Sequence, residues 1–91
     1  MRRFLVEAYT PANSVIEDIE DRARRAAAEL SASGTPVRYT RPIFVPEDET
    51  CFYLLEAESR HAASEALRRA GVSPQRVTEA VDETATKEDQ P

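Results

Sequence analysis

The stretch CFYLLEAES, residues 51–59, is the most informative part of the sequence for the fold. It is an apolar run, typical of a strand, that carries a carboxylate near its end and leads directly into the start of a helix. Successive side chains of a strand point to opposite faces. The odd positions from Cys51 to Ala57 then face one side, and the even positions from Phe52 to Glu56 face the other. Burying an unpaired carboxylate under a layer of helices is costly. We therefore expect Glu56 on a sheet face that no helix covers.

The stretch RRFLVEAY, residues 2–9, repeats this pattern. Alternation puts Phe4, Val6 and Ala8 on one face. The opposite face receives Leu5, Glu7 and Tyr9. If the two stretches are neighbouring central strands, Glu7 and Glu56 are expected to meet on the uncovered face.

The segments around these two strands predict four strands and two helices. A helix is expected to start at the capping-box residue Ser14, with Glu17 three positions later, and to end at Gly34. Acids precede bases along it in pairs such as Asp18 and Arg22, which is typical of a solvated helix face. A strand over 37–45, a second helix from near Ser59 to Gly71 and a strand over 76–81 follow. This order, β-α-β-β-α-β, predicts an α+β ferredoxin-like sandwich, an antiparallel sheet with two helices on one face.

Composition limits the classes of protein. We expect one domain over 1–81, followed by a disordered acidic tail over 82–91 with nothing large and apolar to bury. A net charge of −5 disfavours nucleic acid as a partner. No apolar run is long enough to span a membrane. A single cysteine, Cys51, excludes an internal disulfide, and we expect a cytoplasmic location.

The uncovered face would expose much apolar surface beside its charges. An antiparallel sheet can face water on one side, but an exposed patch of this kind marks an interaction site. We expect a homodimer, a dimeric α+β barrel with a cavity between two such faces. Pro42 cannot donate to a ladder, so its strand is expected to be an edge strand or to carry a bulge there. Arg38 and Arg41 have opposite phases in a regular strand, so only one of them is expected on this face unless Pro42 marks a bulge. The candidate ligand-binding residues are Glu7, Tyr9, Phe52, Glu56, Arg38 and Arg41.

The two carboxylates allow several roles. Each could form an ion pair with an arginine, both could hold a divalent cation, or they could act as a general acid/base pair. His61, the single histidine, is expected in the first turn of the second helix. It could join Glu7 and Glu56 as a metal ligand.

Three segments together resemble a known family. RFLVE (3–7), FYLLEAES (52–59) and EALRRAGV (65–72) are similar to small, mostly uncharacterised ferredoxin-like domains, some of which are described as nickel-binding proteins. The resemblance implies a homodimer and nickel as the metal, with Glu7 and Glu56 at acidic positions of the family pattern. That pattern often places histidines where this chain has Arg38–Arg41 and Ala66.

Three functions remain open at this point. The first is a non-enzymatic dimeric domain that binds a small ligand or a divalent metal such as nickel in the cavity. The second is a cofactor-free monooxygenase or cyclase of the dimeric α+β barrel kind. The third is a protein-interaction module, whose sheet face binds a different protein.

Overall fold

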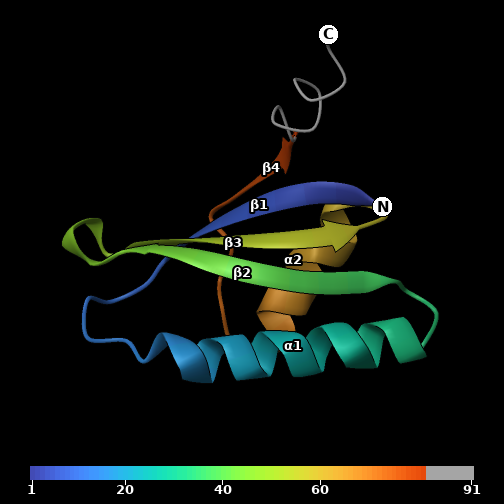
Figure 1. Cartoon of the computed structure of the whole chain (residues 1–91), viewed down its shortest axis with the longest axis horizontal. Helices are drawn as coiled ribbons and strands as arrows, with labels where there is room; N and C mark the ends of the chain where they lie inside the picture. The colour runs from blue at the N-terminus through green and yellow to red at the C-terminus, as the bar shows by residue number, and fades with distance from the viewer. Residues whose placement is uncertain (82–91) are drawn as a thin grey trace, which may run out of the picture.

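The computed structural model describes residues 1–81 and confirms the predicted element order. The single sheet has the strand order β2-β3-β1-β4, with every neighbouring pair antiparallel. Both helices pack on one side of it (Figure 1). The ferredoxin-like α+β fold is thus confirmed, while the predicted disorder of 82–91 lies outside the described residues. The elements are β1 (Arg2–Tyr9), α1 (Ile16–Ala32), β2 (Val37–Val45), a 3-10 turn (Pro46–Asp48), β3 (Thr50–Ala57), α2 (Arg60–Arg69) and β4 (Arg76–Ala80).

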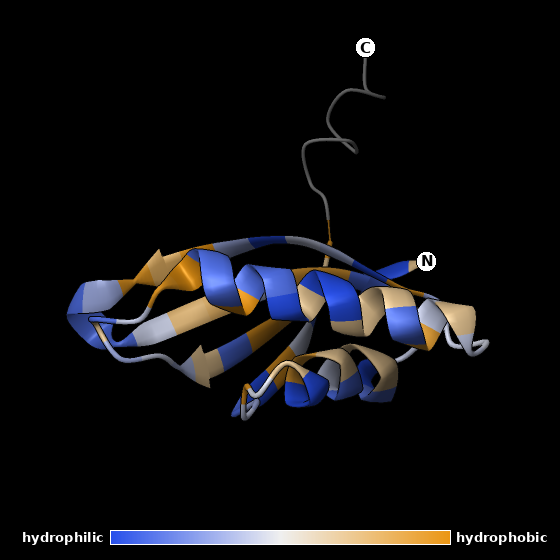
Figure 2. Ribbon diagram, turned by 90° about the horizontal axis from the view of Figure 1, so that it is seen from below, coloured by the Kyte–Doolittle hydropathy of each residue, from blue (hydrophilic) through white to orange (hydrophobic). Residues whose placement is uncertain are grey.

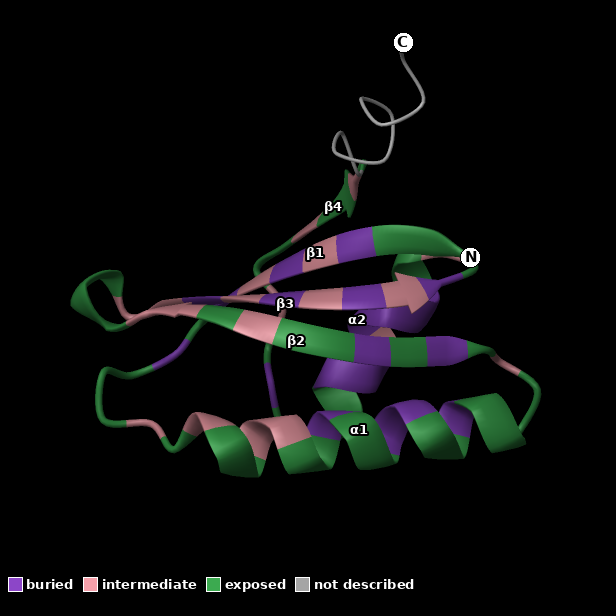
Figure 3. Ribbon diagram, in the orientation of Figure 1, coloured by how far each residue is buried: buried purple, intermediate pink, exposed green. Residues whose placement is uncertain are grey.

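Burial alternates along the two central strands as the sequence predicts. Phe4, Val6 and Ala8 of β1 are fully buried beneath the helices. In β3, Tyr53 and Leu55 are fully buried too. Figure 3 shows β1 and β3 striped by buried and half-buried residues, because one face of each strand is covered and the other is not.

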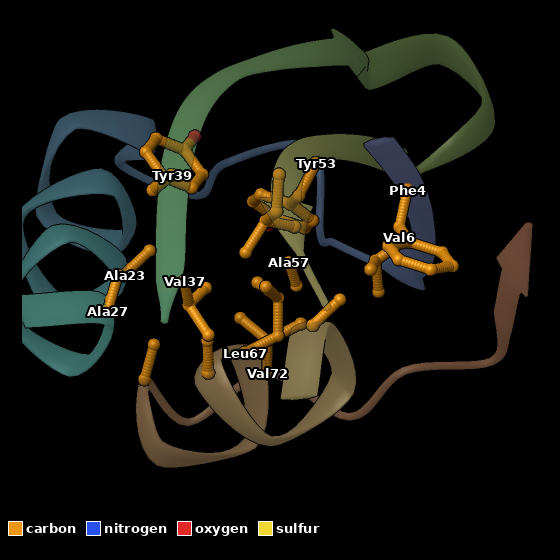
Figure 4. Packing of buried hydrophobic residues seen from close by; sticks show 14 of the residues in the cluster. Phe4, Val6, Ala23, Ala27, Val37, Tyr39, Tyr53, Ala57, Leu67 and Val72 are labelled. Carbon is orange, nitrogen blue, oxygen red and sulfur yellow. The ribbon is translucent and has the colours of Figure 1, made fainter. Parts of the chain in front are cut away.

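The helices lie close to the sheet because their inner faces carry small side chains. Ala23 and Ala27 of α1 are buried against the sheet, and Leu67 of α2 fills the space beneath Tyr53 and Ala57 (Figure 4). Figure 2 shows many hydrophilic residues along the outside of α1. The core is a single layer between one sheet face and the two helices. Burial of its apolar side chains stabilises the folded state by about 25 cal/mol per Å².

Both helices end in the same hydrogen-bonded cap. At the end of α1, Gly34 has φ 99° and the Thr35 amide donates to the Leu30 carbonyl at 2.9 Å. At the end of α2, Gly71 has φ 85° and the Val72 amide donates to the Leu67 carbonyl at 2.9 Å. These are Schellman caps, which favour glycine because a left-handed backbone strains other residues. The predicted helix ends at both glycines are confirmed.

The predicted start of α1 is wrong. The helix begins at Ile16, and its N-cap is Val15, which provides no side-chain hydrogen bond. The Ser14 amide instead donates to the Pro11 carbonyl at 2.9 Å, so Ser14 belongs to a turn that precedes the helix. The predicted start of α2 is confirmed, since the Ser59 hydroxyl caps it by accepting from the Ala62 amide at 3.1 Å.

A bulge in β2 corrects the expectation for the two arginines. The register of β2 against β3 shifts between Tyr39 and Arg41. Arg38 lies opposite Glu56 and Arg41 lies opposite Leu54, so both arginines share the uncovered face. The extra residue of a bulge reverses the alternation of every later side chain. Since β2 is an edge strand, its proline is tolerated there as expected.

The left-handed backbone at the end of α2 gives the first prediction. An added Cβ at Gly71 would meet no atom within 4 Å, so Gly71→Ala tests the backbone conformation alone. We expect the free energy of unfolding to fall by about 1 kcal/mol, with a smaller loss for Gly71→Asn. Urea denaturation of the two variants measures this. An alanine variant as stable as the parent would contradict the positive φ.

Candidate functional site

The face of the sheet away from the helices, here called the open face, carries three rows of side chains that run across the four strands. The first row is mostly charged, the middle row is apolar at its centre, and the third row is charged on β4 and β1 and apolar on β3 and β2. The rows consist of Ala80, Arg3, Glu56 and Arg38; Thr78, Leu5, Leu54 and Arg41; and Arg76, Glu7, Phe52 and Ile43.

Glu56 lies between two arginines. One carboxylate oxygen is 3.5 Å from Arg3 Nε and the other is 3.7 Å from Arg38 Nη1. Both arginine side chains are largely exposed, so these pairs add little stability. They do neutralise the carboxylate at the end of an apolar strand. Of the roles considered for Glu56, the geometry supports the ion pair.

Glu7 lies on the open face as expected, but it does not meet Glu56. Across the β1–β3 pair, Glu56 is opposite Arg3, four positions along β1 from Glu7. Four residues of strand extend about 13 Å. Leu5 and Leu54 form the row between the two carboxylates. An acid/base pair made by Glu7 and Glu56 within one chain is therefore not formed.

Glu7 borders a shallow hollow of about 240 Å³ on the open face. The other lining residues are Leu5, Phe52, Arg76 and Thr78. Glu7 is half-buried, and it forms no ion pair within residues 1–81, although Arg76 is its neighbour in register. The hollow therefore combines an apolar floor with a carboxylate that remains available to a ligand.

The residues expected to bind a metal are not brought together within one chain. His61 lies exposed in the first turn of α2, in the helical layer, whereas Glu7 and Glu56 lie on the open face. Residues 1–81 contain no group of three histidine, cysteine, aspartate or glutamate side chains that could hold a metal ion. A metal site using Glu7 would need donors in addition to those that residues 1–81 of one chain bring to it.

A larger cavity of about 330 Å³, missed by sequence reasoning, lies between the loop after β1 and the loop after α2. The two loops contain the pairs Thr10-Pro11 and Ser73-Pro74, which are typical of chain breaks, but nothing in the sequence places these loops side by side. The tertiary fold does so, and the Gln75 amide donates to the Glu7 carbonyl at 2.8 Å.

Two buried hydroxyls lie beneath this cavity. The oxygens of Tyr53 and Thr10 are 3.3 Å apart, and the Thr10 hydroxyl donates to the Ala8 carbonyl at 3.2 Å. Burial raises the pKa of Tyr53 to about 12, against a smaller opposing effect of the hydrogen bond with Thr10. Burial also raises the pKa of the Cys51 thiol, which disfavours the thiolate. Cys51 is thus a packing residue.

Within residues 1–81, none of the helices combines the length and apolar character that crossing a membrane requires.

Comparison with known proteins adds evidence on the fold. No family model and no curated protein matches the chain. Among solved structures, the chain is similar to SCO4226 from Streptomyces coelicolor A3(2), with a TM-score of 0.64 and 18% sequence identity. The likeness covers 86% of this chain and 94% of that chain. At this identity it supports the ferredoxin-like fold and carries no function with it.

The buried phenol gives a prediction for alkaline solution. The Tyr53 pKa rises from 10.0 to about 12 on folding, so the unfolded chain loses this proton first. The stabilising contribution is complete below pH 10 and is lost as pH rises toward 12. Urea denaturation at a series of pH values measures the slope. Tyr53→Phe is expected to reduce the slope and to leave the part that comes from Tyr39 and Cys51, whose pKa values burial also raises. It is also expected to lower stability by about 1 kcal/mol, through the lost hydrogen bond.

Tyr9→Phe is the matched control, because the Tyr9 side chain is 59% exposed. This variant should retain the parent's slope. An unchanged slope in Tyr53→Phe would contradict the assignment of the alkaline loss to Tyr53.

Proposed function

We propose that this chain is a non-enzymatic homodimeric domain that binds a small ligand between two open faces. The observation that carries the proposal is Glu7, a half-buried carboxylate without an ion pair in residues 1–81, at an apolar hollow that no helix covers. Burying a carboxylate without a partner is costly. A bound ligand, or a group from a second copy, offsets this cost.

The apolar surface of the open face supports a second copy as the cover. Leu5, Leu54 and Phe52 are half-buried at its centre, and Ile43 is 44% exposed beside them. A closed two-fold pair would cover the same patch on both molecules. The paired sheets would form a dimeric α+β barrel, with the hollow as part of its interior.

Charge on the open face supports the same arrangement. Glu7 lies near the β4 edge of the sheet, and Arg41 lies on the β2 edge. Neither side chain forms an ion pair within the part of the chain that is described. A two-fold axis that places the β4 edge of one copy over the β2 edge of the other would bring Arg41 of the second copy to Glu7. The symmetry would form this ion pair twice.

The ligand class follows from the groups around the hollow. Glu7 accepts hydrogen bonds, Arg76 and an incoming Arg41 donate them, and Leu5 and Phe52 contact an apolar body. A small polar organic molecule fits this set. A divalent cation such as nickel is the other class proposed, supported by the available oxygens of Glu7, with its remaining donors supplied by the second copy. The separation of Glu7 from Glu56 favours binding over acid–base catalysis.

A cytoplasmic setting completes the proposal. It is supported by Cys51, the single cysteine, which is a buried free thiol.

The dimer is tested by placing a charge at the centre of the open face. Leu54→Lys puts an ammonium beside Arg41 and inside the proposed interface, so we expect a monomer in place of a dimer. Ala28→Lys, at an exposed position on α1, is the matched control and should remain dimeric. Light scattering coupled to gel filtration gives the mass, and circular dichroism checks the fold. A monomeric parent protein would overturn the dimer and favour an interaction module for a different protein.

Binding of a divalent cation at Glu7 is tested by calorimetry. Metal-free protein is titrated with nickel, and separately with zinc. If the ligand is a cation, Glu7→Gln abolishes the heat because it removes the carboxylate oxygens. Glu47→Gln changes an exposed residue of the turn between β2 and β3, and should bind as the parent does. Absence of heat with both metals would exclude the cation and leave the small organic molecule.

A further inference from the structure

A second site lies at the loop end of the sheet beside α1, apart from the hollow on the open face. The cavity of about 330 Å³ between the loops that follow β1 and α2 is here called the loop pocket, lined by residues 9–11, 14, 19, 22, 53 and 71–75. Its volume is within the range of small-molecule sites, which is roughly 300–1,000 Å³. Sites of this kind combine apolar walls with a few placed polar groups.

The walls of the loop pocket are mostly apolar. Ile19 comes from α1, Val72 from the turn after α2, and Pro11 and Pro74 from the two loops. Beneath them the Tyr53 hydroxyl bonds to the Thr10 hydroxyl, which itself donates to the Ala8 carbonyl, so the floor offers little to a polar group. The chemistry of this surface suits the apolar body of a ligand.

One charge borders the loop pocket. Of its twelve lining residues, Arg22 alone is ionised at neutral pH. The sequence suggested an ion pair of Arg22 with Asp18, but Arg22 Nε donates instead to the Ala70 carbonyl at 2.8 Å. This bond fixes the guanidinium at the end of α2. Its two terminal nitrogens have neither a hydrogen-bond partner nor an ion pair within residues 1–81, and they are the atoms that bind carboxylates in bidentate fashion.

We propose that the loop pocket binds a small organic monocarboxylate, with its apolar body between the two loops and its carboxylate on Arg22. A neutral or cationic molecule of the same shape fits less well, since the pocket offers a fixed cation and no lining carboxylate. Tyr9 was expected among the ligand-binding residues of the open face, but it does not line the hollow there and borders the loop pocket instead. Its side chain, 59% exposed at the end of β1, provides an aromatic wall for a ring.

A competing anion site must be separated from this one. Arg22 also borders a smaller groove of about 170 Å³ between the two helices, together with Arg25, Glu29 and Arg69. That groove carries its own carboxylate, Glu29, and offers less apolar surface. Arg25 borders the groove but not the loop pocket, so Arg25→Gln is the matched control for Arg22→Gln.

The experiment compares three probes that share one body and differ in charge: phenylacetate, phenylacetamide and 2-phenylethylamine. Each is titrated into the full-length ¹⁵N-labelled protein while amide chemical shifts are followed. Phenylacetate is expected to shift the amides of residues 10, 12–14, 71–73 and 75 saturably. It is also expected to bind about tenfold more tightly than phenylacetamide, through its charge-assisted hydrogen bonds. The amine is expected to bind most weakly.

The variants decide where the carboxylate binds. Arg22→Gln should weaken phenylacetate about tenfold and leave phenylacetamide unchanged, whereas Arg25→Gln should change neither. Ser73→Trp, at an exposed position of the lining, puts an indole in the pocket and should abolish binding of both. Thermal unfolding checks that each variant is folded. Leu54→Lys should bind as the parent does, because the loop pocket does not include the open face.

Three results would overturn the proposal. The first is the absence of saturable shifts for phenylacetate up to about 10 mM, which corresponds to binding too weak for a dedicated site. The second is equal affinity for phenylacetate and phenylacetamide. The third is an equal loss in Arg22→Gln and Arg25→Gln, which would place the anion in the groove between the helices.

Discussion

The antiparallel pairing of β1 with β3 is the constraint on which the rest of the structure depends. Its register sets Phe4 opposite Leu55 and Val6 opposite Tyr53, so the buried residues of both strands share one face. A slip of one residue would turn one strand over relative to the other and place either Glu7 or Glu56 beneath the helices, at a large cost in free energy. The side that the helices cover and the residues of the open face both follow from this one register.

The chemistry of the open face depends on how β2 joins this pair. Because the bulge after Tyr39 shifts the alternation, Arg38 and Arg41 face the same way, and Arg38 reaches Glu56. The carboxylate at the end of the apolar strand is then explained by arginines on both neighbouring strands. Glu7 forms no ion pair with an arginine within residues 1–81. Glu56 is therefore a structural carboxylate, whereas Glu7 is the carboxylate proposed to bind a ligand.

The two proposed sites use the two sides of the sheet differently. The open face has rows of side chains that no helix covers, and the proposed second copy and ligand would lie on it. The loop pocket is formed where two irregular segments cross the end of the sheet beside α1. Arg22 contributes to it because its Nε bonds to the last turn of α2, a contact between elements far apart in the sequence.

The order of the elements and the faces of β1 and β3 could be predicted from the sequence, because they depend on the periodicity of apolar residues. The ends of both helices at Gly34 and Gly71 could be predicted too, because they depend on local backbone preference. The expected start of α1 at Ser14 was wrong because a turn with Pro11 competed for its amide. The tertiary structure alone decided the facing of Arg38 and Arg41, the separation of Glu7 from Glu56, and the loop pocket. Each of these depends on a strand register or on loop packing, which join residues that no local pattern relates.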